Sequence, residues 1–283
     1  MVTLKDYGNY ETAWCPGCGN FSILQAVKQA LVASQLKPEQ VLFVSGIGQA
    51  AKEPHYLTVN LFDGLHGRSL PIATGAKLSN SHLKVIVDSG DGCNYGEGGN
   101  HFLAAIRRNI DVTLLVHNNQ VYGLTKGQAS PTSEEGFITK VQPQGVSSTP
   151  FNPVAIAVAM RASFVARGFS GSVDHLAGLM QQAIAHRGFA LVDILQPCVS
   201  FNKVNTFNWY KNRCQELPAD YDPTNWEAAM KKAEEWGDTI PIGILYKNER
   251  KCFEDHFSVL KRGPLVGQEV DSRKLMDIME EYR

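Results

Sequence analysis

Two short apolar stretches, each followed by polar residues, constrain the fold of this 283-residue chain more than any other feature. Residues 85–87 are β-branched and lead into Gly90-Asp91-Gly92, and residues 112–116 lead into Asn118-Asn119. A helical pattern over residues 100–108 lies between them. Short β-branched runs are typical of buried parallel strands, and open α/β sheets bind ligands where such strands end. The pattern therefore predicts a strand–helix–strand unit with a ligand site at its polar edge.

The residues at this edge favour a diphosphate that is held through a metal ion. Asp91 offers a carboxylate and Asn119 an amide oxygen, which are the hard ligands that Mg²⁺ prefers. The glycines allow backbone N–H groups to approach phosphate oxygens, and the start of the following helix adds a favourable dipole. A glycine-rich turn alone is weak evidence, because most such turns are only loops. The pairing of Gly90-Asp91-Gly92 with Asn118-Asn119 is much more specific.

Composition excludes several classes of function. The net charge of −1 and the isoelectric point near 6.7 give no basic surface for nucleic acid. No apolar run is long enough for a membrane span or a signal peptide, so we expect a soluble, cytoplasmic protein without a membrane partner. Six cysteines in such a chain indicate metal or redox use. The turn Cys15-Pro16-Gly17-Cys18 is compatible with half of a zinc site, half of an iron–sulfur site or a redox dithiol.

Longer segments resemble one known family. The pairing of GDG with NN resembles the thiamine-diphosphate motif, and GGNHFLAAIRRNIDVT and NNQVYGLTKGQASPT resemble the β subunit of 2-oxoacid:ferredoxin oxidoreductases. The resemblance continues in WCPGCGN (14–20), SGIG (45–48), HGRSLPIATG (66–75) and QPC (196–198). It covers roughly residues 10–205 and implies an α/β fold, a doubly wound parallel sheet of the thiamine-diphosphate-binding type, with a C-terminal extension.

The resemblance also implies roles for individual residues. Those that would contact the cofactor are Ile47, Gly48, Gln49, Ala50, His66, Gly90, Gly92, Cys93, Gly123 and Leu124. Those that would bind Mg²⁺ are Asp91, Asn119 and, through its carbonyl, Val121. His66 and Lys126 would act on substrate or cofactor, with a weaker expectation for Lys52. Lys126 would favour a substrate with a second carboxylate, such as 2-oxoglutarate, or contact coenzyme A.

The chain departs from the family at the iron–sulfur cluster. Cys15, Cys18 and Cys198 match three of the family's four cluster ligands, but Gln49 stands where the third cysteine is expected. Cys93 is a second departure, because the family usually has an acidic residue there. Three thiolates can hold a three-iron cluster, or a four-iron cluster with an oxygen or nitrogen ligand. We expect a bound cluster, in first place a 4Fe-4S cluster.

The rest of the chain is assigned from its patterns. Residues 1–205 are expected to form the cofactor-binding domain, and residues 206–283 an extension without its own core that packs on a partner subunit. Residues 129–152 are expected to form a mobile surface loop. Helices are expected at 21–31, 70–78, 151–160, 173–184 and 226–236, and further strands at 41–44, 164–166 and 190–195.

The resemblance implies a β subunit that decarboxylates pyruvate or 2-oxoglutarate oxidatively, with thiamine diphosphate, Mg²⁺ and coenzyme A, to acyl-CoA, CO₂ and reduced ferredoxin. An α subunit should supply the pyrimidine-binding domain, because this chain resembles only the diphosphate-binding one. A cluster-free thiamine-dependent decarboxylase or acyl-transfer subunit is compatible with Gln49 but leaves the three cysteines unexplained. A zinc-binding assembly module leaves the GDG and NN pairing unexplained.

Overall fold

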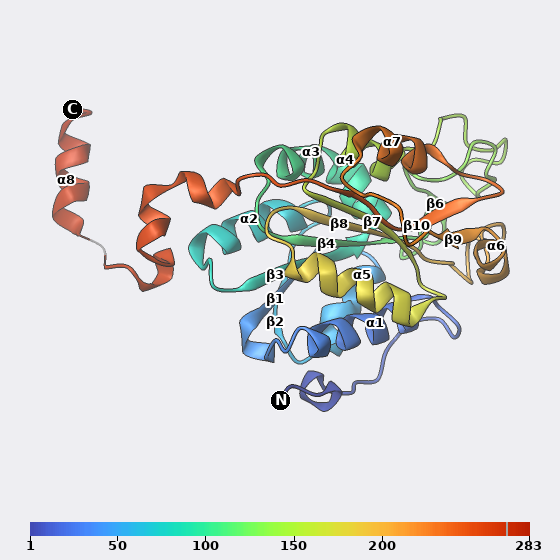
Figure 1. The fold of residues 1–283 in the computed structure, drawn as a ribbon, viewed down its shortest axis with the longest axis horizontal. Coiled ribbons are helices and arrows are strands. Elements are labelled where there is room, and N and C mark those ends of the chain that lie inside the picture. The colour runs from blue at the N-terminus through green and yellow to red at the C-terminus, as the bar shows by residue number, and fades with distance from the viewer. Residues whose placement is uncertain (270) are drawn as a thin grey trace.

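The computed structural model describes residues 1–269 and 271–283, and within these residues the main sheet has eight strands. Their order across the sheet is β2-β1-β3-β4-β8-β7-β10-β9 (Figure 1). All neighbouring pairs are parallel except β7 and β10, which run antiparallel. The strands are β1 (Val41–Ser45), β2 (Asn60–Asp63), β3 (Lys84–Gly90), β4 (Thr113–Asn118), β7 (Phe164–Phe169), β8 (Ala190–Leu195), β9 (Cys214–Glu216) and β10 (Ile240–Lys247). A separate hairpin pairs β5 (Val121–Tyr122) with β6 (Gln128–Ala129).

Helices cover both faces of the sheet, because parallel neighbours can be joined only by crossover connections. The helices are α1 (Asn20–Ala33), α2 (Ser69–Ser79), α3 (Gly99–Arg108), α4 (Pro153–Ala159), α5 (Val173–Ala185), α6 (Phe207–Lys211), α7 (Trp226–Glu234) and α8 (Ser272–Glu280). One core lies between the sheet and α1 and α5, and the other lies under α2, α3, α4 and α7 (Figure 1). The central strands β4, β7 and β8 are buried along their whole length. The predicted fold class is confirmed, with two strands, β10 and β9, that run opposite to the other six.

The carboxyl ends of β1, β3 and β4 lie side by side, because these strands are neighbours in the order of the sheet. After β1 the chain passes through 46–49 into a 3₁₀ segment, Ala50–Tyr56. After β3 it passes through Asp91 into one π-helical segment, Gly92–Glu97, before α3 begins. Such π-helical segments are frequent at functional sites. The fold therefore gathers the polar strand ends at one edge of the sheet, as the sequence predicts.

The prediction of a mobile surface loop over residues 129–152 is wrong for its first part. Ser130, Thr132 and Ser133 are buried, with at most 7% of any of them exposed. The Ser130 N–H donates to Ser133 Oγ over 2.9 Å, and the Ser133 hydroxyl donates to the carbonyl of Gln120 over 2.5 Å. Serine and threonine are typical of loops because their hydroxyls can form hydrogen bonds with nearby backbone groups. Here the groups that these hydroxyls contact lie inside the protein. The first part of this segment is therefore buried and not a surface loop.

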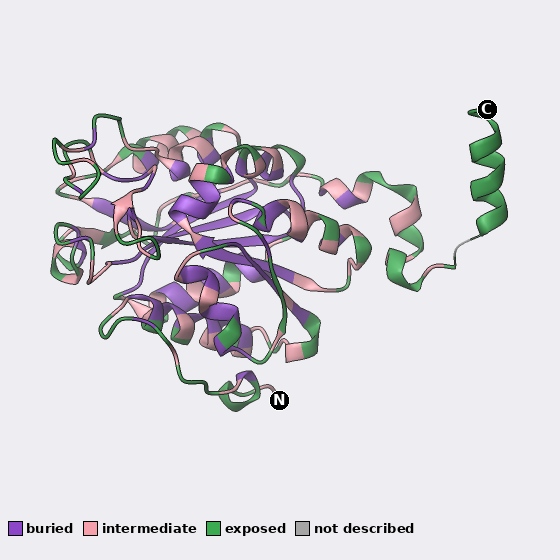
Figure 2. Ribbon diagram, turned by 180° about the vertical axis from the view of Figure 1, so that it is seen from behind, coloured by how far each residue is buried: buried purple, intermediate pink, exposed green. Residues whose placement is uncertain are grey.

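The domain boundary expected at residue 205 does not separate two independently packed parts of the chain. β10 lies beside β7 within the main sheet, and α7 packs on α4, so residues 206–247 share the core of the preceding domain. The later part differs: α8 is exposed along its whole length and stands apart from the sheet (Figures 1 and 2). Docking of this last part on a partner stays a prediction. Among the described helices, none combines the length and the apolar character needed to cross a bilayer.

Candidate active site

A cavity lies at the carboxyl ends of β1, β3 and β4. It contains every residue that the sequence predicts for cofactor and Mg²⁺ binding, together with Tyr122 and Thr125, which the sequence analysis missed. The lining residues are Ile47, Gly48, Gln49, Ala50, His66, Gly90, Asp91, Gly92, Cys93, Asn119, Val121, Tyr122, Gly123, Leu124 and Thr125. Residues from four separate segments thus meet in one place. Their individual roles stay predictions.

Asp91 is the only carboxylate among the residues that line this cavity within the described chain, and it is 1% exposed. Its Oδ2 accepts hydrogen bonds from the hydroxyls of Ser130, over 2.5 Å, and Thr132, over 2.7 Å. Burial raises the pKa of the Asp91 carboxyl to about 6, although both hydroxyls lower it. A buried carboxylate without a full counter-charge is unfavourable, and a divalent cation would provide that charge.

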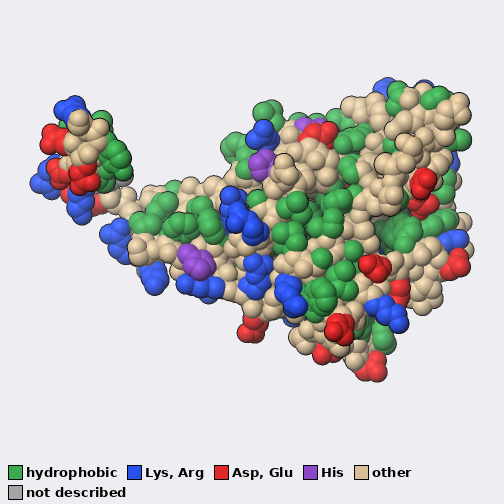
Figure 3. Space-filling model, turned by 90° about the horizontal axis from the view of Figure 1, so that it is seen from above, with side chains coloured by type: hydrophobic (Ala, Val, Ile, Leu, Met, Phe, Trp, Pro, Cys, Tyr) green, Lys and Arg blue, Asp and Glu red, His purple; other side chains and the backbone are tan. Residues whose placement is uncertain are grey.

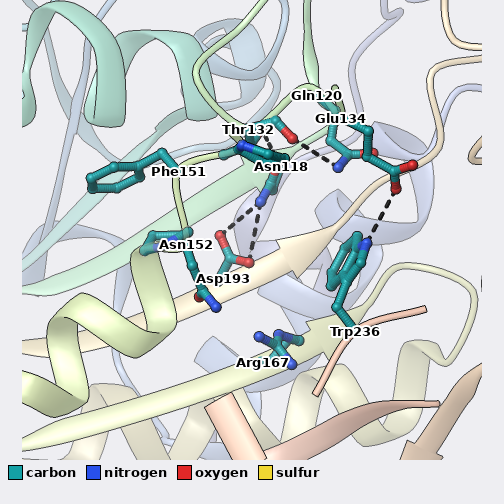
Figure 4. Close-up of a pocket in the computed structure, with 11 residues that line it drawn as sticks. Asn118, Gln120, Thr132, Glu134, Phe151, Asn152, Arg167, Asp193 and Trp236 are labelled. Atoms are coloured by element: carbon teal, nitrogen blue, oxygen red, sulfur yellow. Dashed lines mark hydrogen bonds between the residues drawn. The ribbon is translucent and has the colours of Figure 1, made fainter. Parts of the chain in front are cut away.

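Thr132 belongs to a hydrogen-bonded network with Asn118 and Asp193 (Figure 4). The Thr132 hydroxyl also lies 2.8 Å from Asn118 Oδ1, and Asn118 Nδ2 donates to both oxygens of Asp193 over 3.3 Å. The Tyr95 hydroxyl donates to Asp193 over 2.8 Å. Asn118, Thr132 and Asp193 also line a second pocket, together with Arg167, which is 2% exposed and donates to two backbone carbonyls. A network of this kind fixes the rotamers of the groups that it contains.

Asn119 and Val121 add oxygen atoms to the site. Asn119 Oδ1 accepts the Val121 N–H over 3.0 Å, which leaves a second lone pair on the amide oxygen. A carboxylate, an amide oxygen and a backbone carbonyl line one cavity, and this donor set fits Mg²⁺. Gly92 leaves room for the Tyr122 ring at the wall of the cavity, because a Cβ at this position would lie 2.3 Å from Cε1 of Tyr122. The residues present therefore fit a metal-bound diphosphate.

The segment that contains Cys198 lies against the turn that contains Cys15 and Cys18. The Ser200 hydroxyl donates to the Cys15 sulfur over 3.1 Å, and Gln196 Nε2 donates to the Cys18 sulfur over 3.3 Å. The turn at residues 15–18 is closed by a hydrogen bond of 3.0 Å from the Cys18 N–H to the Cys15 carbonyl. Burial raises the pKa of the Cys18 thiol, and the Asn20 N–H lowers it. A metal or a cluster would hold the three cysteines as thiolates.

Gln49 lies beside this cysteine turn. Its backbone carbonyl accepts a hydrogen bond of 2.8 Å from the indole N–H of Trp14, the residue before Cys15. Its side-chain Oε1 is buried and has no hydrogen-bond partner among the described residues. An unsatisfied buried amide oxygen indicates a missing partner. The position is thus consistent with the third ligand position that the resemblance implies, although ligation itself stays a prediction.

His66 lies at the mouth of the cavity with a carboxylate that the sequence analysis did not single out. Its Nδ1 is 3.0 Å from Oε2 of Glu97, without the direction of a good hydrogen bond. The Tyr122 hydroxyl donates to the same oxygen over 3.2 Å. Glu97 therefore holds Tyr122 and attracts a protonated His66. Nothing in its glycine-rich sequence context distinguishes this glutamate from an exposed loop residue.

The two predicted lysines do not line the cavity. Lys126 is exposed on the turn between β5 and β6, and Lys52 is half-buried in the segment Ala50–Tyr56. Lys126 has a φ of +84°, which is uncommon for a residue with a side chain. Strained conformations of this kind cluster at functional sites. Because neither lysine lines the cavity, the described residues place no lysine beside the Asp91 carboxylate.

Comparison with known proteins agrees with this geometry. The thiamine pyrophosphate enzyme family, in its C-terminal TPP-binding domain, matches residues 43–194, and the C-terminal region of the pyruvate ferredoxin oxidoreductase β chain matches residues 198–262. A solved 2-oxoglutarate:ferredoxin oxidoreductase from Magnetococcus marinus, with 2-oxoglutarate, coenzyme A and succinyl-CoA bound, superimposes with a TM-score of 0.91 at 34% identity. That similarity covers 98% of this chain and 96% of the other.

Two characterised relatives show the same relationship at the level of sequence. The β subunit of 2-oxoacid:ferredoxin oxidoreductase 1 from Aeropyrum pernix is 49% identical over 249 residues, 84% of this chain and 78% of that relative. The 2-oxoglutarate oxidoreductase subunit KorB from Mycobacterium tuberculosis is 46% identical over 70% of this chain and 53% of the relative. The chain therefore belongs to the β subunits of the 2-oxoacid:ferredoxin oxidoreductases and is part of an oxidoreductase.

Proposed function

We propose that this chain, as the β subunit of a heteromeric complex, oxidatively decarboxylates a 2-oxoacid with coenzyme A to an acyl-CoA and CO₂, and reduces ferredoxin. The observation that carries the proposal is the cavity at the strand ends, where Asp91, Asn119 and Val121 converge with the predicted cofactor-contacting residues. Membership of the family supports the class of reaction. The cavity is the place in this chain where we propose that the cofactor binds.

Asp91, Asn119 and the Val121 carbonyl would hold Mg²⁺, and the metal would hold the diphosphate of thiamine diphosphate. The bound cofactor supplies the electron sink that decarboxylation of a 2-oxoacid requires. The residues of this chain would orient it: Gly92 leaves room for the Tyr122 ring beside the cofactor, and the Thr132 hydroxyl keeps Asp91 in place. An α subunit would provide the other half of the cofactor site. The reacting atoms would then lie between two subunits.

Cys15, Cys18 and Cys198 would hold an iron–sulfur cluster that passes electrons to ferredoxin. The contacts of Ser200 with the Cys15 sulfur and of Gln196 with the Cys18 sulfur support this role, because they hold the segment around Cys198 against the cysteine turn. Gln49, whose Oε1 has no hydrogen-bond partner among the described residues, would lie at the third ligand position. The same residue favours a second candidate function, a thiamine-dependent decarboxylase or acyl-transfer subunit without a cluster. Iron and acid-labile sulfide in the purified complex separate the two.

The substrate side of the proposal concerns His66 and Lys126. His66 lines the cavity and carries a potential positive charge beside Glu97, so it is placed to meet the carboxylate of a 2-oxoacid. Lys126 is exposed and follows Thr125, which lines the cavity, and it would bind a distal carboxylate. The solved relative from Magnetococcus marinus contains 2-oxoglutarate and coenzyme A. We therefore propose 2-oxoglutarate ahead of pyruvate, with coenzyme A as acceptor.

The C-terminal part of the chain is proposed to contact a partner subunit. Four apolar side chains of α8 are each at least 50% exposed, and nothing in the described chain covers them: Leu275, Met276, Ile278 and Met279. Figure 3 shows α8 projecting beyond the body, with charged side chains beside the hydrophobic ones. An exposed apolar stripe on an isolated helix is unfavourable in water, so a partner surface is the natural cover.

The test is an Asp91→Ala variant purified with its partner subunit. Loss of the carboxylate should remove both thiamine diphosphate and Mg²⁺ from the complex, measured by thiochrome fluorescence and elemental analysis. An Asp220→Ala variant, which removes an exposed carboxylate, is the matched control and should retain both. Full retention of both cofactors by Asp91→Ala would show that the metal is bound elsewhere.

A further inference from the structure

Three ionisable side chains share a buried space on the side of the sheet that α1 covers. Glu53 comes from the segment Ala50–Tyr56, Asp88 from β3 and His117 from β4, and each is 0% exposed. His117 Nε2 lies 2.8 Å from Oδ1 of Asp88 and 3.8 Å from Oε2 of Glu53. One ligand atom from each residue lies within 4.8 Å of the others. The function proposed above uses none of these three side chains.

The contact on the other side of the ring fixes the orientation of His117. Nδ1 lies 2.9 Å from Oδ1 of Asn20, and this contact turns Nε2 toward the two carboxylates. The contact between Nε2 and Asp88 lacks the direction of a hydrogen bond. The arrangement is that of a metal-binding histidine oriented by an outer partner.

Apart from their contacts with His117, the carboxylates of Glu53 and Asp88 form no hydrogen bond or ion pair with the described residues. Neither oxygen of Glu53 and neither oxygen of Asp88 has a hydrogen-bond partner among the described residues. Burial and the neighbouring Asp88 both raise the pKa of Glu53, and Lys28 lowers it only as the smallest effect. The Lys28 ammonium itself donates to the Gly8 carbonyl over 2.8 Å. Buried carboxylates are normally paired or bound to a metal ion.

We propose that Glu53, Asp88 and His117 bind one Zn²⁺ ion, at a site separate from the proposed Mg²⁺ site. A divalent cation neutralises the two carboxylates, and a neutral imidazole adds no charge. One nitrogen and two carboxylate oxygens suit Zn²⁺, whereas Mg²⁺ and Ca²⁺ prefer oxygen ligands throughout. Three protein ligands leave one position for water in a tetrahedral site. This inference does not depend on the reaction proposed above.

The ion would join three segments that build the active site, and the contact between His117 and Asn20 would add a fourth. Asn20 stands two residues after Cys18, and Glu53 stands four residues after Gln49. Asp88 and His117 lie in the strands that end at Asp91 and Asn119. A metal ion at this place would therefore fix the cysteine turn and the cofactor loop to the strand ends. Its role is positional, because none of the three residues lines the cofactor cavity.

The experiment measures first-row metals and sulfide in the complex purified with its partner subunit. We expect about one zinc per chain in the wild type, because a site whose three ligands are fully buried should retain its ion through purification. Glu53→Gln keeps the size of the side chain but removes its charge, and it should lower zinc content about tenfold or more. Asp63→Asn is the matched control. It alters the exposed carboxylate that contacts His55 over 2.7 Å and should keep its zinc.

Two further measurements make the result decisive. Asp91→Ala should lose Mg²⁺ and thiamine diphosphate but keep zinc, and loss of zinc as well would contradict the separation of the two sites. Anomalous scattering at the zinc edge from wild-type crystals should give a peak between Glu53, Asp88 and His117. This measurement decides the question if Glu53→Gln fails to assemble. No peak there, another metal in its place, or full zinc in Glu53→Gln would overturn the proposal.

Discussion

The Asn119 side chain donates a hydrogen bond of 3.2 Å to Oε1 of Gln196, and Nε2 of Gln196 donates in turn to the Cys18 sulfur over 3.3 Å. One glutamine side chain thus connects the proposed metal position with the proposed cluster position. The two sites share a wall, so their geometries are coupled. We expect a substitution at Asn119 or Cys18 to change the geometry at the other residue, because both contact the Gln196 amide.

The first prediction concerns the pH dependence of cofactor binding. Asp91 binds Mg²⁺ only when deprotonated, and burial raises its pKa to about 6, so retention of metal and thiamine diphosphate should fall as pH falls through this value. The Thr132 hydroxyl stabilises the charged form. Thr132→Val should therefore raise the pKa further and move the midpoint of cofactor retention upward by about one pH unit.

Titration calorimetry of the complex with Mg²⁺ and thiamine diphosphate across the pH range measures this midpoint. Thr113→Val is the control: it removes a buried hydroxyl at the other end of β4, where the hydroxyl donates to the Ala183 carbonyl over 3.3 Å. This control should leave the midpoint unchanged. A downward shift in Thr132→Val would contradict the proposed role of the hydroxyl.

The second prediction concerns the close approach at Gly92. A Cβ here would meet the Tyr122 ring at 2.3 Å, so Gly92→Ala should displace the turn that follows Asp91 and weaken thiamine diphosphate binding about tenfold or more. At Gly99, where α3 begins, a Cβ meets nothing within 4 Å, and Gly99→Ala should bind normally. Equal affinities for both variants, by equilibrium dialysis, would show that the diphosphate does not depend on this turn.

The third prediction concerns the missing cysteine. Gln49→Cys places a thiol at a position whose side-chain oxygen is buried and unpartnered. A thiolate is a better iron ligand than an amide oxygen, so the variant should hold its cluster for longer in air. Iron, sulfide and the visible absorption are followed over time, beside the wild type. If neither protein contains iron when prepared without oxygen, the cluster proposal fails and the cluster-free alternative stands.

The fourth prediction concerns substrate choice. Lys126→Gln keeps most of the side chain but removes its charge, and it should raise the KM for 2-oxoglutarate about tenfold, as expected for loss of one charge-assisted hydrogen bond. The KM for pyruvate should change little, because pyruvate has no distal carboxylate. Lys140→Gln, an exposed lysine on the neighbouring loop, serves as control. An equal loss on both substrates would leave Lys126 without a selective role.

Much of this fold could be predicted because its signals are local. The central strands are continuous apolar runs, and the residues at their ends can be read directly, so β3, β4 and the polar edge beyond them were found from the sequence. Ser130 and Thr132 were assigned to a surface loop instead, because their partner, Asp91, is distant in sequence. β10 was missed for a similar reason: its place in the sheet depends on pairing with β7.

The sequence by itself determined which chemical groups this protein can use: a carboxylate and amides at the strand ends, three cysteines, and a glutamine in place of a fourth. The order of the residues fixes that inventory. Only the tertiary structure decided which groups meet. The burial of Asp91 against two hydroxyls and the convergence of Glu53, Asp88 and His117 arise from segments that are far apart in the chain. Contacts of that kind depend on packing between elements, which no local pattern encodes.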